Sequence, residues 1–165
     1  MPHPLPPRDT DLRFRRVVTG VGPDGRSCVV SDGPVPEGAA WTEPGTGRGA
    51  DPWIVESLPV DLAELADPTA HYVLQEWPSP GGAIARVISW EPGFAYPLHR
   101  SETLDVGWVL AGRVELILED SSVELAAGDT IVQRGTMHGW KVLGDSPAIL
   151  ACVLLDATHD VQSHP

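Results

Sequence analysis

The stretch from Gly93 to Trp140 constrains the fold more than any other part of the chain. Short runs of aliphatic residues alternate in it with glycine-containing turns at Gly112, Gly128 and Gly135. Runs of this length, bounded by turn residues, favour β-strands over helices. Many short strands at turn-marked intervals pack as an antiparallel sandwich or barrel, so the sequence predicts an all-β fold.

The same stretch carries the residues that best indicate chemistry. Side chains alternate between the two faces of an extended chain, so odd-numbered positions from residue 99 to residue 109 share one face. His99 and Asp105 are therefore directed to the same side, and His138 lies on a later predicted strand. Two imidazoles and a carboxylate that converge inside a β-structure are typical of a metal site.

The spacing of these residues resembles the two motifs of the cupin family. The first motif is Gly, five residues, His, one residue, His, three or four residues, Glu, six residues and Gly. Gly93, His99 and Gly112 fit it in register, whereas Ser101 stands in place of the second His and Asp105 in place of the Glu. In the second motif Gly128, Gly135 and His138 match, with one residue fewer after Gly128 and with Gln133 in the Pro position. The wording around the motifs is similar to that of small single-domain cupins.

The resemblance implies a double-stranded β-helix, the jelly-roll barrel of cupins, and a homodimer. It also implies that His99, Asp105 and His138 point into the barrel mouth. We predict a single cupin domain at residues 13–156, with a flexible Pro-rich N-terminus at 1–12 and a flexible tail at 157–165. For the homodimer contact we expect the N-terminal hairpin or the 33–52 loop to contribute.

Outside the motifs, local patterns predict further elements. Two strands around Gly22–Gly25 indicate an N-terminal β-hairpin extension. Residues 33–52 read as a long loop because they are rich in Pro and Gly. One short helix is predicted at 61–67, where Asp61 caps and Pro68 terminates. The remaining strands are predicted at 53–58, 71–77, 83–90, 106–110, 114–119, 123–125, 130–132, 138–142 and 148–155.

Charge and composition exclude several classes of partner. The net charge of −12 argues against nucleic acid and against anionic membrane surfaces, because both require clusters of Lys and Arg. The apolar run at 148–155 is too short to span a bilayer. No apolar signal-peptide core is visible near the N-terminus, so we expect a cytoplasmic protein with a small-molecule substrate. Cys28 and Cys152 lack any motif spacing and read as reduced thiols.

The site residues leave several roles open. His99, Asp105 and His138 form a two-His, one-carboxylate set that suits Fe, Mn, Ni or Zn, or else a metal-free acid/base cluster without a cofactor. Arg86 lies in mid-strand among apolar residues and either clamps a substrate carboxylate or pairs with an acidic residue of the fold. The other candidates for substrate binding are Trp140, Gln133, Met137 and Ser101.

Three classes of function follow. The first is a metal-assisted, non-redox enzyme that decarboxylates, isomerises, cyclises or dehydrates a carbonyl or carboxylate substrate, with His99, Asp105 and His138 as catalytic residues. An Fe(II)-dependent dioxygenase would use the same ligands. The alternatives are a non-catalytic barrel that binds a small ligand and a metal-free acid/base enzyme.

Overall fold

The computed structural model describes residues 14–62 and 66–158. The chain divides into two compact units, Met1–Val35 and Pro36–Pro165. The predicted flexible N-terminus lies outside the described residues, as does most of the predicted tail. The predicted domain range of 13–156 stays a prediction.

The first unit contains the predicted N-terminal hairpin. Strand β1 (Arg15–Val21) pairs antiparallel with β2 (Ser27–Pro34). In the turn between them the Asp24 carboxylate accepts a hydrogen bond from the Arg26 amide at 3.1 Å, and Gly25 takes a φ of 76°. Arg15 and Asp32 form a bidentate ion pair across the two strands, with both N···O distances at 2.8 Å. Turn residues and strand propensity thus produce the expected hairpin.

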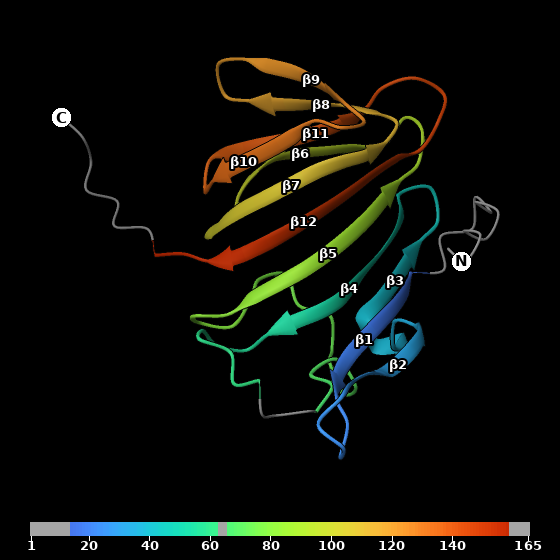
Figure 1. Ribbon diagram of the computed structural model, residues 1–165. Helices are drawn as coiled ribbons and strands as arrows, with labels where there is room; N and C mark the ends of the chain where they lie inside the picture. Colours follow the sequence, from blue (N-terminus) through green and yellow to red (C-terminus); the bar gives the residue numbers. More distant parts are fainter. Residues whose placement is uncertain (1–13, 63–65, 159–165) are drawn as a thin grey trace. The chain divides into compact units, whose positions relative to one another are not determined.

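The second unit is built from two antiparallel sheets (Figure 1). The six-stranded sheet has the order β10-β7-β12-β5-β4-β3 and the four-stranded sheet the order β6-β11-β8-β9. The strands are β3 (Ala40–Glu43), β4 (Gly47–Val55), β5 (Ala83–Trp90), β6 (Ala95–Arg100), β7 (Thr103–Ala111), β8 (Arg113–Leu118), β9 (Ser122–Ala126), β10 (Thr130–Arg134), β11 (Met137–Val142) and β12 (Ala148–Asp156). This architecture confirms the predicted all-β jelly roll.

The apolar core lies where the two sheets face each other. Alternation produces it: in β7 the odd-numbered Thr103, Asp105, Gly107 and Val109 are buried, whereas Trp108 is exposed. Burying one large aliphatic or aromatic side chain contributes about 1.5–3 kcal/mol, so this cluster is the main stabilising feature of the unit. Its buried members are Trp90, Val109, Val114, Leu116, Ile131, Trp140, Val142, Ala148 and Leu150.

Gly112 allows β7 to turn directly into β8. Its φ is 73°, in the left-handed region, and a Cβ there would collide with the backbone oxygen of Pro147. Only glycine meets both conditions. The glycine that ends the first sequence motif is therefore a requirement of the turn.

Two predictions in the N-terminal half of this unit are wrong. The predicted loop at 33–52 contains a 3-10 turn, η1 (Glu37–Ala39), the strand β3 and the start of β4. Its glycines and prolines are accommodated because β4 pairs with β5, and because Gly49 leaves room for the Trp41 ring. The predicted strand at 71–77 is a turn followed by irregular chain, which bonds to a side chain of β5 as described below.

The predicted helix at 61–67 falls partly on residues 63–65, which lie outside the described residues. Within the ranges that are described, no helix is long and apolar enough to cross a membrane.

Candidate functional site

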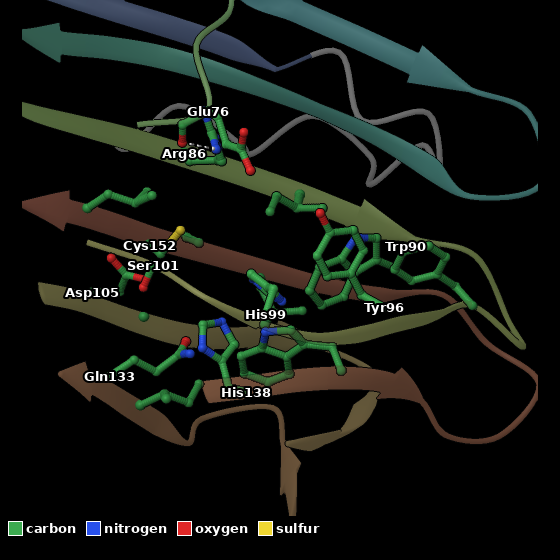
Figure 2. Close-up of a pocket in the computed structure, with 18 of the residues that line it drawn as sticks. Glu76, Arg86, Trp90, Tyr96, His99, Ser101, Asp105, Gln133, His138 and Cys152 are labelled. Carbon is green, nitrogen blue, oxygen red and sulfur yellow. Dashed lines mark hydrogen bonds between the residues drawn. The ribbon is translucent and has the colours of Figure 1, made fainter. Parts of the chain in front are cut away.

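A cavity of about 350 Å³ opens in the second unit (Figure 2). Strands of both sheets line it, because their inward-facing positions meet there. Aromatic and aliphatic residues form much of its wall, and β6, β7, β10 and β11 each contribute one of four polar residues: His99, Asp105, Gln133 and His138. The lining includes Trp41, Ile88, Trp90, Phe94, Tyr96, His99, Ser101, Asp105, Gln133, His138, Trp140, Leu150 and Cys152.

Stacked rings form the apolar wall of the cavity. Trp90 lies 5.4 Å from Phe94 and 5.8 Å from Trp140, measured between ring centroids. Tyr96 meets the His99 ring edge to face at 4.6 Å. Rings in such contacts restrict one another, so the wall is a shaped surface for an apolar ligand.

His99 and His138 lie side by side on paired strands. They are register partners in β6 and β11, and their ring centroids are 4.2 Å apart. The Nδ1 of His99 is 3.0 Å from the Pro97 carbonyl oxygen, and the Nδ1 of His138 is 2.8 Å from the Thr136 carbonyl oxygen. A carbonyl oxygen can only accept, so Nδ1 carries the proton in both rings. In the neutral form of either ring, the Nε2 lone pair is therefore available to the cavity.

Burial lowers the pKa of His138 and raises the pKa of Asp105. Desolvation lowers the pKa of His138, and the adjacent His99 adds to this, against a smaller opposing effect of the bond to Thr136. Desolvation raises the pKa of Asp105, opposed by the Thr103 hydroxyl and by the charges of Arg86 and His99. His138 is thus held as a neutral base, and Asp105 keeps its proton to higher pH than a surface carboxyl would.

Two polar atoms in the wall have no hydrogen-bond partner among the described residues: Oδ1 of Asp105 and Nε2 of Gln133. Both side chains are more than nine-tenths buried, with exposures of 9% and 8%. Unpaired buried polar atoms cost about 1–3 kcal/mol each, so such atoms in a cavity point to a missing partner.

Of the three predicted metal ligands, His99 and His138 lie together, whereas Asp105 does not join them in one cluster. The two imidazoles suit a metal, because metal-binding histidines commonly donate their other ring N–H to a backbone carbonyl. However, no three His, Cys, Asp or Glu side chains in the described part of the chain lie close enough together to hold one ion. Asp105 therefore does not complete a set with His99 and His138, and metal binding stays a prediction.

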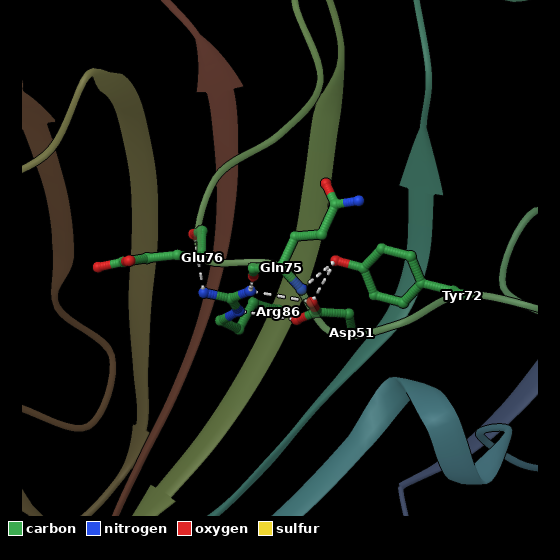
Figure 3. Close-up of polar contacts among 5 residues, drawn as sticks. All are labelled: Asp51, Tyr72, Gln75, Glu76 and Arg86. Carbon is green, nitrogen blue, oxygen red and sulfur yellow. Dashed lines mark hydrogen bonds and ion pairs between the residues drawn. The ribbon is translucent and has the colours of Figure 1, made fainter.

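Arg86 lines the cavity but pairs with the fold (Figure 3). Its Nε and Nη2 donate to the two carboxylate oxygens of Asp51 at 2.7 and 2.9 Å. Its Nη2 and Nη1 also donate to the carbonyl oxygens of Gln75, at 2.5 Å, and Glu76, at 3.4 Å. Asp51 is fully buried and also accepts from the Tyr72 hydroxyl at 3.0 Å. Of the two roles predicted for Arg86, the structure shows the pairing with an acidic residue of the fold, Asp51.

The other predicted residues divide between the wall and its surroundings. Trp140, Gln133 and Ser101 line the cavity, whereas Met137 is not part of its lining. Sequence reasoning missed Tyr96 and Cys152. Tyr96 lies within the first motif, three residues before His99, a position that could have drawn attention to it.

Cys152 lines the cavity from β12, although the sequence predicts only a reduced thiol at this position. Burial raises the pKa of its thiol to about 12.

Comparison with known proteins agrees with this architecture. Residues 86–154 match the family model of the cupin domain, so this part of the chain is similar to a cupin domain. The solved cupin domain of Cnp3 from Schizosaccharomyces pombe superposes with a TM-score of 0.52 at 14% identity, covering 87% of this chain and 88% of that one. At that identity the likeness concerns the fold alone.

Several fungal relatives are more similar in sequence. The cupin-domain-containing oxidoreductase srdD of Neurospora crassa is 35% identical over 120 residues, which cover 66% of this chain and 58% of the relative. The phomopsin biosynthesis cluster protein C' of Diaporthe leptostromiformis is 36% identical over 88 residues, or 50% of this chain and 47% of the relative. The chain spans about half the length of these curated relatives.

Proposed function

We propose that this protein is a small-molecule enzyme of the cupin type that moves a proton on a carbonyl substrate by acid/base chemistry. The observation that carries the proposal is the histidine pair, with both Nδ1 protons held by backbone carbonyls and both rings lining an apolar cavity. A neutral imidazole positioned in this way acts as a general base. The lowered pKa of His138 favours its neutral, basic form, and the raised pKa of Asp105 extends the pH range in which its carboxyl can donate a proton.

The chemistry that this arrangement allows is an isomerisation or a dehydration. Nε2 of His138 takes a proton from the carbon next to a carbonyl, and the electron pair of that C–H bond moves onto the carbonyl oxygen. The protonated Asp105 carboxyl donates its proton to this oxygen, which gives an enol. The hydroxyl proton of the enol then returns to Asp105. If His138 at the same time protonates the γ-carbon of a conjugated enol, the substrate is isomerised; if a β-hydroxyl leaves as water with the proton from His138, the substrate is dehydrated.

The test uses benzylacetone, a neutral aryl ketone whose size suits the aromatic wall. We expect the protein to catalyse solvent deuterium incorporation next to the carbonyl, followed by NMR, and we expect His138→Gln to slow it about a hundredfold. The matched control is His71→Ala, which removes an exposed histidine that does not line the cavity. Equal exchange in wild type and His138→Gln contradicts the proposal.

The predicted metal-dependent chemistry is separated from this proposal by a chelator. Exchange that survives EDTA treatment supports the acid/base enzyme. Exchange that is lost with EDTA and restored by one divalent ion supports the metal-assisted alternative. Benzylacetone that binds with Trp quenching but shows no exchange supports the non-catalytic binding barrel.

A redox reaction is the second candidate, because four of the fungal relatives carry the name oxidoreductase. Oxygen consumption that depends on added Fe(II) and on the presence of a small-molecule substrate would support it. An oxygen electrode measures this directly. If the Fe(II)-loaded protein consumes no oxygen and deuterium exchange resists EDTA, the acid/base enzyme is favoured.

A further inference from the structure

We infer that Asp105 and Gln133 form a recognition site for a neutral amide group, in which an N–H donor stands beside a carbonyl acceptor. The inference deepens the proposed function and rests on it in one respect: the bound molecule is taken to be the substrate. It names the polar end of that substrate.

The geometry of the two strands sets up the pair. Gln133 and Asp105 are direct register partners in β10 and β7. Directly opposed residues of an antiparallel pair have their side chains on the same face, about 4.5–5.5 Å apart at Cβ. Both side chains line the cavity (Figure 2), and both carry a buried polar atom without a hydrogen-bond partner among the described residues. One is a carboxyl oxygen and the other an amide nitrogen.

The complement of this pair is a group with a donor and an acceptor side by side. The Gln133 Nε2 donates to a carbonyl oxygen of the ligand, and Asp105 Oδ1 accepts from its N–H. A primary amide or a lactam presents an N–H donor and a carbonyl acceptor side by side. When Asp105 is protonated, its hydroxyl can donate to the same carbonyl, so a neutral amide suits either state of the carboxyl.

Charge excludes the carboxylate substrate that the sequence suggested as one option. Glu43, Glu76, Arg86 and Asp105 are the charged residues of the cavity wall. Both bidentate nitrogens of Arg86 are already bonded to Asp51, so its charge is matched within the fold. A ligand carboxylate would then lie beside the Asp105 carboxyl, which repels it whenever Asp105 is ionised, and Arg86 would not offset its charge. The wall therefore selects a neutral polar end, with an aromatic or aliphatic body against Trp90 and Trp140.

Three compounds with one phenylethyl skeleton test this: hydrocinnamamide, benzylacetone and hydrocinnamate, with affinities measured by isothermal titration calorimetry. We expect the amide to bind about tenfold more tightly than the ketone, because only the amide donates to Asp105, and the carboxylate to bind most weakly. Asp105→Asn should weaken amide binding about tenfold and strengthen carboxylate binding, because it removes the like charge. Gln133→Met should weaken the binding of both carbonyl compounds.

The matched control is Val132→Ala, which changes an exposed neighbour on the opposite face of β10. It should leave all three affinities unchanged. Carboxylate binding equal to or tighter than amide binding overturns the inference, as does the lack of measurable amide binding or an Asp105→Asn protein with unaltered preference. Near-UV circular dichroism confirms that each variant is folded.

The two proposals fail separately. His138→Gln should slow deuterium exchange about a hundredfold and keep the amide preference. A preference for amide without any exchange removes the acid/base function and leaves the recognition site. Exchange without an amide preference removes only the recognition site.

Discussion

At the scale of single residues, Cys152 shows how the cavity alters ordinary chemistry. Its thiol reaches the cavity, and burial raises its pKa to about 12. Because the thiolate is the reactive form, only a very small fraction of Cys152 is reactive at pH 8. Cys28 is exposed on the hairpin. The two free thiols should therefore differ in reactivity although both are reduced.

We expect iodoacetamide to label Cys28 at least about a hundredfold faster than Cys152 in the folded protein at pH 8. The raised pKa also means that the folded state binds more protons than the unfolded state between the ordinary thiol pKa and about pH 12. The free energy of unfolding that the protonated Cys152 thiol contributes is therefore fully present below the ordinary thiol pKa, and it is lost as the pH rises to about 12. Mass spectrometry of labelled peptides measures the rates, and the Cys28→Ser variant isolates Cys152. Similar rates for both thiols would contradict the expectation.

At the scale of elements, the pair of Asp51 on β4 and Arg86 on β5 attaches the segment after Tyr72 to the six-stranded sheet. The guanidinium reaches the carbonyls of Gln75 and Glu76, and the Tyr72 hydroxyl reaches Asp51. A segment without a strand partner is in this way held by one buried ion pair. Removing one partner leaves the other charge buried and unmatched, which is far more costly than removing both.

We expect Asp51→Ala to lower the free energy of unfolding by about 3–5 kcal/mol, because Arg86 then loses its counter-ion. The double variant Asp51→Leu with Arg86→Met should recover a large part of this loss. Urea denaturation measures both. The control is Arg113→Met, which removes a partner of the exposed pair with Glu124 and should cost at most about 1 kcal/mol. A double variant less stable than Asp51→Ala would contradict the account.

At the scale of the whole molecule, the outer face of the six-stranded sheet bears on the homodimer that the family resemblance implies. Trp108 and Leu110 on β7 and Val132 on β10 are 40%, 55% and 60% exposed, because they alternate with residues that face the cavity or core. Contiguous exposed apolar side chains on a sheet mark contact surfaces. We propose that a second copy of the chain covers this face.

Light scattering after size exclusion should give about twice the monomer mass of 17.7 kDa at micromolar concentration. Val132→Lys combined with Trp108→Glu should shift the protein to the monomer, because both charges would be buried in the contact. Val73→Lys, which changes an exposed residue outside this face, should leave the mass unchanged. A monomeric wild type would exclude the dimer. A double variant that remains dimeric would show that the contact lies elsewhere, for example in the hairpin or the 33–52 segment, where the sequence predicts it.

The fold was predictable wherever local signals act alone. Strand alternation and turn glycines such as Gly112 depend on neighbours in sequence, so the hairpin and most strands from Ala83 onwards could be read from the sequence. The strand β6 was not predicted, and His99 and Asp105 lie on strands of different sheets, not on one face of a single strand as expected. The segments 33–52 and 71–77 could not. Their conformation depends on partners far along the chain: β5 pairs with the first, and the Arg86 side chain bonds to the second.

The sequence by itself determined an all-β protein and many of the residues that face its interior, because side-chain periodicity and turn chemistry are local. Only the tertiary structure decided how those residues are used. It joined His99 to His138, paired Arg86 with Asp51 and left Asp105 and Gln133 with buried atoms in need of a partner. Distances, burial and hydrogen-bond partners arise from strands remote in sequence, and they set protonation and ligand choice.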